Sequence, residues 1–399
     1  MKVVTDKQRI DTIFNRGIVV EVLPSKEEFF KRLLSGERLR IYIGADPTSN
    51  ALHLSHAKNY MFLEELRQLG HETIILFGDF TAQIGDPTNR NEARPELTEK
   101  QIKENVAGWI SQIKPLMDFD DKKNPPRILY NSTWLAKLSL KNAIALAHQF
   151  TVQQMLERDM FEKRWKGNIP IYLHEFLYPV MQGYDSVAMD VDVELCGTDQ
   201  TFNALAGRTL LRRLKNKEKF VVALNLMANP KTGELMSKSK GTGVFLSAPP
   251  NEMFGAIMAQ PDEMIEVLFV NCTRIPLEEK DSIMALGPRN AKARVALEIV
   301  KKFYGEEGAR RAERVFERTF REGIVPEDVP DIKLKKGDTL VEKLVKGGVI
   351  SSKAEWRRLI RGGAVRDEKN TKIADPSFTP RRTTVLKIGK RRFIKVIVP

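Results

Sequence analysis

Residues 39–78 read LRIYIGADPTSNALHLSHAKNYMFLEELRQLGHETIILFG, and the apolar spacing in this stretch decides the fold class. Residues 39–45 and 73–78 are short apolar runs that end in a turn, a pattern typical of buried strands. Residues 53–69 lie between them and have apolar side chains at helical spacing. A strand, a helix and a second strand in this order predict a crossover unit with parallel strands. We therefore expect an α/β fold built on a parallel sheet.

Similar patterns continue beyond this unit and predict a larger domain. We expect helices at 99–117, 153–165, 173–188 and about 199–214, and strands at 193–197 and 219–225. Ligands of such sheets bind at the carboxyl ends of the strands, so polar residues at those ends are candidates for a site. Residues 250–322 have mostly helical patterns, and residues 325–333 contain two prolines and are typical of a linker.

The bulk composition argues against several classes of protein. The chain has 399 residues, which suggests two or three domains at about 150 residues each, and its 42% of hydrophobic residues allow a sizeable core. No apolar run approaches the roughly 20 residues of a membrane span, and no secretory signal pattern is visible. Two cysteines argue against a disulfide framework and cannot form a zinc site alone. We expect a cytoplasmic protein without a structural zinc or a membrane anchor.

Positive charge is concentrated near the C-terminus. The chain has a net charge of +13, and residues 335–399 hold 18 Lys and Arg against 6 Asp and Glu, a balance of +12. A nucleic-acid backbone favours such a concentration, because each neutralised phosphate releases counterions. A solubilising tail is the alternative explanation.

His53 and His56 are three residues apart at the start of the helix expected at 53–69, so they share one face. The free N–H groups and the dipole of a helix N-terminus favour phosphate, and imidazoles there could donate hydrogen bonds as charge develops. The hydroxyl of Thr48, just before them, suits the same purpose. The alternatives are two surface histidines or half of a metal site. The chain has only five histidines and no acidic partner at metal spacing, so we predict no metal ligands.

A second candidate phosphate segment is residues 233–241, GELMSKSKG. Small residues around lysines suit a loop that closes over a triphosphate, where Lys238 could neutralise charge on a leaving pyrophosphate. A lone Ser-Lys-Ser is a common exposed turn and has little weight by itself. The two segments together have more weight, because they lie before and after the sheet of one predicted domain.

The two segments resemble the HIGH and KMSKS signatures of the class I aminoacyl-tRNA synthetases, which adenylate an amino acid with ATP and pass it to tRNA. A third cluster narrows the resemblance, since Tyr178, Gln182 and Asp185 share one face of the helix at 173–188. Such groups are costly to bury together unless something polar fills the space between them, although pairing with other side chains is the alternative. The pattern is similar to the tyrosine pocket of the tyrosyl-tRNA synthetases, and the resemblance extends along nearly the whole chain.

The resemblance implies a role for each matching residue. Tyr42 and Asp185 would bind the phenolic hydroxyl of L-tyrosine; Asp86, Tyr178 and Gln182 would surround its ammonium group, with support from Asn131; and Gln200 would face its carboxylate. Gly44, Asp46, Ser55, Gly197, Asp199 and Lys238 would bind ATP, with Asp199 on the ribose. Thr48, His53, His56 and Lys238 would act on the phosphates, together with Arg90 and Arg94 of a mobile loop.

The resemblance also implies the reaction and the domain order. Tyrosine would attack the α-phosphate of Mg-ATP, and the tyrosyl group would pass to the 3′ end of tRNA(Tyr). A Rossmann-like catalytic domain at 1–228 with a dimer-forming insertion would precede an α-helical domain at 229–324. A linker at 325–336 and a small α/β RNA-binding domain at 337–399 would follow. We expect a homodimer.

The C-terminal segment resembles the S-four RNA-binding module. A helix there would place Lys353, Arg357 and Arg361 on one face at a spacing of four residues. Such modules bind structured RNA through phosphates and shape. The RNA-binding residues implied are Lys353, Arg357, Arg358 and Arg361, with Lys390, Arg391 and Arg392 as a second patch. Pattern and charge together favour RNA over a solubilising tail.

Two residues depart from the signatures. Ser55 stands where the family usually has glycine against the adenine ring, and Leu235 replaces the first lysine of the second signature. The departures leave two rivals, a paralogue that binds RNA without activating tyrosine and a tryptophanyl-tRNA synthetase. The complete set of pocket residues argues against the first, and Gln182, Asp185 and the basic tail argue against the second.

Overall fold

The computed structural model describes residues 2–86, 97–157, 159–236, 242–321, 330–335, 338–350, 352–367, 371–380, 382–389 and 392–398. The predicted site residues Arg90, Arg94, Lys238, Lys390 and Arg391 lie outside these described residues.

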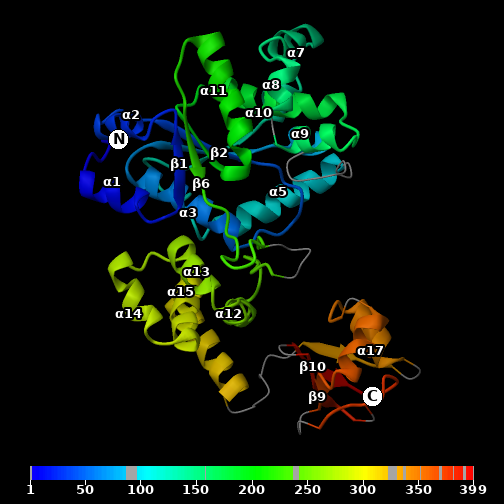
Figure 1. Ribbon diagram of the computed structural model, residues 1–399. Coiled ribbons are helices and arrows are strands. Elements are labelled where there is room, and N and C mark those ends of the chain that lie inside the picture. The colour runs from blue at the N-terminus through cyan, green and yellow to red at the C-terminus, as the bar shows by residue number, and fades with distance from the viewer. Residues whose placement is uncertain are drawn as a thin grey trace. The chain divides into compact units, whose positions relative to one another are not determined.

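The chain divides into two compact units (Figure 1). The first comprises Met1–Pro249 and Ala256–Gly305, and the second comprises Pro250–Gly255 and Glu306–Pro399. Helices α12 (Pro250–Met258) and α15 (Pro288–Arg321) supply residues to both units. Gly305 interrupts α15 with a φ of 73°, a left-handed conformation that glycine adopts without steric cost.

The first unit is built around a six-stranded sheet. Its strands lie in the order β1 (Val19–Leu23), β6 (Phe220–Leu224), β5 (Val193–Gly197), β2 (Arg40–Ala45), β3 (Glu72–Phe77) and β4 (Arg127–Tyr130). All neighbours are parallel except β1, which pairs antiparallel with β6 at one edge. The predicted α/β fold with a parallel sheet is confirmed. The direction of strand progression reverses between β2 and β5, and such a switch point is where open α/β sheets bind ligands.

Helices connect these strands and cover the sheet (Figure 1). They are α1 (Lys7–Phe14), α2 (Lys26–Leu34), α3 (Leu54–Gln68), α4 (Thr81–Ile84), α5 (Glu99–Ile113), α6 (Ser132–Leu135), α7 (Leu140–Ala147), α8 (Val152–Leu156), α9 (Asp159–Lys166), α10 (Leu173–Met189), the 3₁₀ turn η1 (Thr198–Gln200) and α11 (Thr201–Lys215). After the last strand of the sheet, the first unit continues with α13 (Met264–Cys272), η2 (Leu277–Glu279) and α14 (Lys280–Met284). Within the described stretches, every helix is too short or too polar to cross a membrane.

Helices α10 and α11 pack tightly against each other because Gly183 lacks a side chain. A Cβ at this position would lie 3.0 Å from Leu210 Cδ1 and 3.1 Å from the backbone of Ala206. Apolar side chains of both helices share one core cluster with Tyr42 and Leu76 of the sheet. Helix α10, which bears three predicted pocket residues, is therefore anchored to the sheet by its apolar face.

Several observed elements differ from the predicted ones. The helix predicted at 153–165 is two helices, α8 and α9. Strands β1 and β4 are absent from the predicted elements. Glu21 interrupts the apolar run of β1, and β4 has only 4 residues, too few for a clear strand pattern. Strand β7 (Asp331–Lys333) lies inside the range 325–336 that we predict as a linker.

The second unit contains a four-stranded sheet in the order β7, β10 (Arg392–Ile397), β9 (Thr384–Ile388) and β8 (Val365–Arg366). Helices α16 (Leu340–Lys346) and α17 (Lys353–Arg361) share an apolar core with this sheet. Trp356 is buried in that core, and its indole Nε1 donates to Pro376 O at 2.8 Å.

Candidate active site

A cavity of about 350 Å³ lies at the carboxyl ends of β2 and β5, where the strand progression reverses. Fourteen predicted site residues from widely separated segments line it: Tyr42, Gly44, Asp46, Thr48, Ser55, His56, Asp86, Asn131, Tyr178, Gln182, Asp185, Gly197, Asp199 and Gln200. The fold therefore brings residues of separate segments into one cavity, whereas spacing along the sequence relates only residues of the same helix or strand.

Asp185, on α10, is a buried carboxylate with a fixed orientation. Trp134 Nε1 donates to its Oδ1 at 2.7 Å, and Asn131 Nδ2 donates to its Oδ2 at 3.3 Å. Burial raises the pKa of Asp185 well above its usual range, and the two hydrogen bonds oppose that rise. A carboxylate has about four acceptor positions, so Asp185 can accept a further hydrogen bond from a ligand in the cavity.

Tyr42, on β2, is fully buried, and its Oη lies 3.0 Å from Ser186 Oγ. Burial and the neighbouring carboxylates of Glu194 and Asp185 raise its pKa well above the usual value, so the side chain remains a protonated phenol. Behind it, Lys219 Nζ donates to Ser186 Oγ at 2.9 Å and forms an ion pair with Glu194. Lys219 and Glu194 are both buried.

A chain of amide and carboxylate groups runs along another part of the lining. Gln200 Nε2 donates to Asp86 Oδ2 at 2.7 Å, and Asn203 Nδ2 donates to Gln200 Oε1 at 2.8 Å and to Gln182 Oε1 at 3.0 Å. Gln182 Nε2 in turn donates to Glu194 Oε1 at 2.9 Å. The linked side chains fix one another, which keeps the polar surface of the cavity preorganised.

Asp46 follows β2 and accepts two hydrogen bonds from side chains distant in sequence. Tyr178 Oη donates to its Oδ2 at 2.8 Å, and Thr81 Oγ1 donates to its Oδ1 at 2.7 Å. Gly78 makes this approach possible, because a Cβ there would lie 2.1 Å from Asp46 Oδ1 and 2.3 Å from Thr81 Oγ1.

The cavity is strongly acidic. Five carboxylates line it, from Asp46, Asp86, Asp185, Glu194 and Asp199, and no Lys or Arg is among the described residues that line it. Such a surface favours a cationic group and opposes an anionic one. Phosphate can enter only with cations that come from a metal ion or from residues outside this lining.

His56 lines the cavity, and His53 does not. The Nδ1 atom of His56 accepts a hydrogen bond from the backbone N of His53 at 3.3 Å, which leaves the proton of the neutral ring on Nε2. Burial lowers the pKa of His56 to about 3 and that of His53 to about 4, so both rings are neutral at pH 7. His56 can thus donate a hydrogen bond without adding charge.

Backbone hydrogen bonds join the start of α3 to the segment that follows residues 237–241. Leu54 N donates to Val244 O at 3.0 Å, and Leu246 N donates to Leu52 O at 2.9 Å. The chain that follows the second predicted phosphate segment therefore lies, at residues 244–246, beside the first segment.

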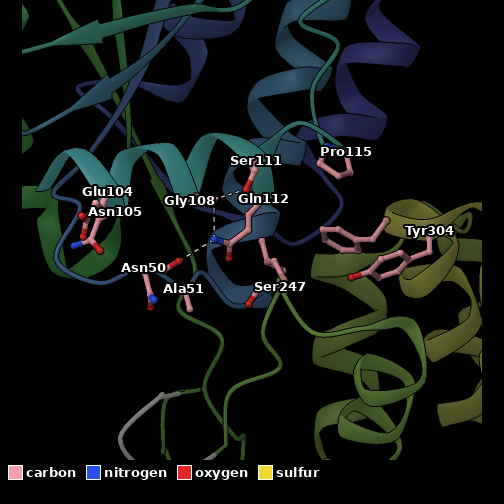
Figure 2. A pocket seen from close by; sticks show the side chains of 12 residues that line it. Asn50, Ala51, Glu104, Asn105, Gly108, Ser111, Gln112, Pro115, Ser247 and Tyr304 are labelled. Carbon is pink, nitrogen blue, oxygen red and sulfur yellow. Dashed lines mark hydrogen bonds between the residues drawn. The ribbon is translucent and has the colours of Figure 1, made fainter. Parts of the chain in front are cut away.

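Helix α5 holds the loop that precedes α3 (Figure 2). Asn105 Nδ2 donates to Pro47 O at 2.8 Å, and Trp109 Nε1 donates to Ser49 O at 2.5 Å. Gln112 Nε2 donates to Asn50 O at 3.0 Å, the bond that Figure 2 shows. The three donors are spaced at four and three residues and so occupy one helical face. They fix the loop that contains Thr48.

A larger hollow of about 730 Å³ is lined by α5, by Asn50 and Ala51 of this loop, and by residues further along the chain (Figure 2). Its lining includes Glu104, Asn105 and Ser111 of α5 with Phe303 and Tyr304 of α15. Glu104 is the one charged residue among the described residues that line it. The convergent titratable groups of an active site lie instead in the smaller cavity.

In the second unit, the predicted RNA-binding residues of α17, Lys353, Arg357, Arg358 and Arg361, are exposed. Arg392 of β10 forms an ion pair with Glu355 at 2.7 Å.

In the first unit, the sequence patterns did not identify four residues of the site or of its surroundings: Trp134, Ser186, Glu194 and Lys219. Trp134 lies one helical turn after Asn131, a spacing that could have indicated it.

Comparison with known proteins gives a consistent result. The family described as "tRNA synthetases class I (W and Y)" matches residues 34–321. The chain is 39% identical to a tyrosine–tRNA ligase of Moorella thermoacetica over 96% of this chain and 94% of that protein. It is 40% identical to a tyrosine–tRNA ligase of Aquifex aeolicus over 95% of this chain and 96% of that protein.

Solved structures show the same fold. A C-terminally truncated mitochondrial tyrosyl-tRNA synthetase of Aspergillus nidulans has a TM-score of 0.65 at 20% identity and covers 78% of this chain and 94% of its own. A tyrosyl-tRNA synthetase of Archaeoglobus fulgidus, complexed with L-tyrosine, has a TM-score of 0.60 at 22% identity and covers 76% of this chain and 99% of its own.

Proposed function

The chain belongs to the class I tyrosyl-tRNA synthetases, and from this premise we propose how its residues divide the work of the reaction. The protein is a tyrosine–tRNA ligase. The tyrosine carboxylate attacks the α-phosphate of ATP, and pyrophosphate leaves. The terminal ribose hydroxyl of tRNA then attacks the carbonyl carbon of the tyrosyl adenylate, and AMP leaves. Positioning and charge stabilisation lower the barrier, and no covalent enzyme intermediate is needed.

The observation that best supports tyrosine as the substrate is the pair of Tyr42 and Asp185 in one cavity. A substrate phenol would donate its proton to Asp185 and accept one from Tyr42. Phenylalanine has no hydroxyl, so it would leave both buried groups without these partners, and such groups are costly. Asn131 and Trp134 hold the Asp185 carboxylate in place to accept this proton.

The acidic part of the lining would bind the substrate ammonium group. Asp86, Tyr178 and Gln182 match the family residues around that group. The hydrogen bond from Gln200 Nε2 holds the Asp86 carboxylate in place, and the negative charge of that carboxylate would attract the ammonium group. Gln200 would also contact the carboxylate that attacks the phosphate.

ATP would occupy the part of the cavity nearer α3. Gly44 and Gly197 have no side chain there, so a ligand could approach their backbone. A Cβ at Gly197 would lie 2.5 Å from Oδ1 of Asp199, the residue that would bind the ribose. Asp46 and Ser55 also line this part, with Ser55 where the adenine ring would pack.

The phosphates would need both donors and cations. Thr48 and His56 line the cavity and would donate hydrogen bonds, and His53 would support His56 through its backbone N. The described lining holds no Lys or Arg, so the cations would be Mg²⁺, which enters with ATP, and Lys238, Arg90 and Arg94. Phosphate oxygens with a few carboxylates form the usual environment of Mg²⁺ in proteins.

An exposed apolar surface on the first unit would form a homodimer contact. Leu140, Ile144, Val152, Trp165 and Leu173, on α7 to α10, are 60–83% exposed. Apolar side chains gathered on one region typically mark an interaction site. We assign this surface to a second copy of the chain and the exposed basic face of α17 to tRNA(Tyr).

The two buried cysteines, which form no disulfide, suit a cytoplasmic protein.

The activity is tested by ATP–pyrophosphate exchange with tyrosine, tryptophan and phenylalanine in parallel. Exchange that depends on tyrosine is expected. Exchange that depends on tryptophan would identify a tryptophan enzyme, and no exchange with any of the three would favour an RNA-binding paralogue.

A further inference from the structure

A buried lysine behind the tyrosine pocket has no part in the division of roles above. Lys219 is fully buried at the start of β6, 33 residues after Ser186 and 25 after Glu194 in the sequence. Its Nζ atom donates to Ser186 Oγ at 2.9 Å, pairs with Glu194 Oε2, and lies 5.9 Å from the ring centroid of Tyr42. An ammonium group is expensive to bury, so its contacts here require an explanation.

The fold reserves space for this ammonium group. Gly207, on α11, faces it, and a Cβ there would lie 2.5 Å from Lys219 Nζ and 2.6 Å from Ser186 Oγ. Any side chain at position 207 would separate Lys219 from Ser186. The contact between the two therefore depends on a glycine from a third element.

The hydrogen-bond donors available to Lys219 and Ser186 indicate the direction of the bonds between them and Tyr42. An ammonium group only donates, so Ser186 Oγ must accept from Lys219 and give its own proton elsewhere. Tyr42 Oη lies 3.0 Å away, and Glu194 Oε2 lies 3.4 Å away, which is long for a hydroxyl donor. The shorter distance favours donation from Ser186 to Tyr42, so that the phenolic proton of Tyr42 is directed to Glu194 or to a ligand in the cavity.

Glu194 would compete more strongly for that proton if its charge were not neutralised. Gln182 Nε2 donates to its Oε1 at 2.9 Å, and the Lys219 ammonium group pairs with its Oε2. Both contacts make the carboxylate a weaker acceptor at its remaining positions. Without Lys219, the carboxylate would draw the proton of Ser186 or of Tyr42. In either case Tyr42 would present a lone pair, rather than a proton, to the ligand.

We propose that Lys219 is a positioning residue for substrate specificity: through Ser186 it makes Tyr42 a hydrogen-bond donor beside the acceptor Asp185. The pocket then matches a hydroxyl, which both accepts and donates. It mismatches an aromatic amine, which donates two protons and accepts poorly. The inference rests on the proposed use of Tyr42 and Asp185 in tyrosine binding.

The test compares tyrosine with 4-aminophenylalanine in ATP–pyrophosphate exchange by the full-length chain. For Lys219→Met, the ratio of kcat/KM for tyrosine to that for 4-aminophenylalanine should fall about two- to tenfold, the worth of a hydrogen bond between neutral groups. The KM for ATP should not change. Lys217→Met is the matched control, because Lys217 pairs with Asp192 outside the cavity, and its ratio should stay at the wild-type value.

A second variant separates positioning from folding. Ser186→Ala removes the hydroxyl that links Lys219 to Tyr42 and leaves the ion pair of Lys219 with Glu194 intact, so the ratio should fall here too. Lys219→Met in the Ser186→Ala background should not lower the ratio further. An equal loss for both amino acids in Lys219→Met, or independent effects of the two substitutions, would overturn the inference. Absence of tyrosine-dependent exchange in the wild-type chain would instead refute the proposed function.

Discussion

Replacement of Trp134 by phenylalanine should change the pH dependence of tyrosine activation. The substitution keeps an aromatic ring and removes the Nε1 donor, which lies 2.7 Å from Asp185 Oδ1. That bond favours the ionised carboxylate and opposes the effect of burial on the Asp185 pKa. Its loss should raise the pKa further, so that Asp185 is protonated, and unable to accept from the substrate phenol, at higher pH than in the wild type.

The size of the effect follows from the strength of the bond. A hydrogen bond to a charged group contributes about 1.5–3 kcal/mol, and about 1.4 kcal/mol corresponds to one pKa unit. The acid limb of the pH profile of kcat/KM for tyrosine should therefore move up by about one to two units. At a fixed pH on that limb, kcat/KM should fall about 10- to 100-fold.

The assay is tyrosine-dependent pyrophosphate exchange measured across pH, with Trp356→Phe as the control. That substitution removes an indole donor of similar geometry, 2.8 Å from Pro376 O, in the core of the second unit. Exchange does not require tRNA, so the profile of the control should match the wild type. If Trp134→Phe lowers the rate uniformly and leaves the acid limb in place, the hydrogen bond does not tune Asp185.

Three further predictions address ATP, the apolar surface and the basic helix. Ser55→Gly should lower the KM for ATP about two- to fivefold by removing a side chain from the adenine contact; an unchanged or higher KM would contradict this. Leu173→Glu, at a position 83% exposed, should weaken self-association at least about tenfold in sedimentation, since it places a charge in an apolar contact, whereas Leu286→Glu on another surface should not. Arg357→Ala should reduce the salt dependence of tRNA binding by about one phosphate contact and leave pyrophosphate exchange unchanged; reduced exchange would show a role outside RNA binding.

The extent to which the sequence predicts the fold depends on the pattern of each element. The strand at 40–45 was predictable because residues 41–45 form a run without a charged side chain, followed by polar residues. Strand β1 was not, because Glu21 interrupts its apolar run. Helix α10 was predictable from its periodicity, and the same periodicity placed Tyr178, Gln182 and Asp185 on one face.

The missing part of the site consists of contacts between distant segments. Trp134 reaches Asp185 across 51 residues, and Lys219 reaches Ser186 across 33. Spacing along one helix or strand contains no information about such pairs. The space for Lys219 also depends on Gly207, whose role appears only when a Cβ is placed against its neighbours.

The central claim is that Asp185 and Tyr42 form hydrogen bonds with the substrate hydroxyl. The selectivity of Asp185→Asn between tyrosine and phenylalanine tests it most directly. An amide accepts a weaker hydrogen bond than a carboxylate, so kcat/KM for tyrosine should fall at least about tenfold while that for phenylalanine stays constant. Asp190→Asn, at the exposed end of the same helix, should leave both values unchanged. Equal losses for tyrosine and phenylalanine in Asp185→Asn, or no loss for tyrosine, would contradict the claim.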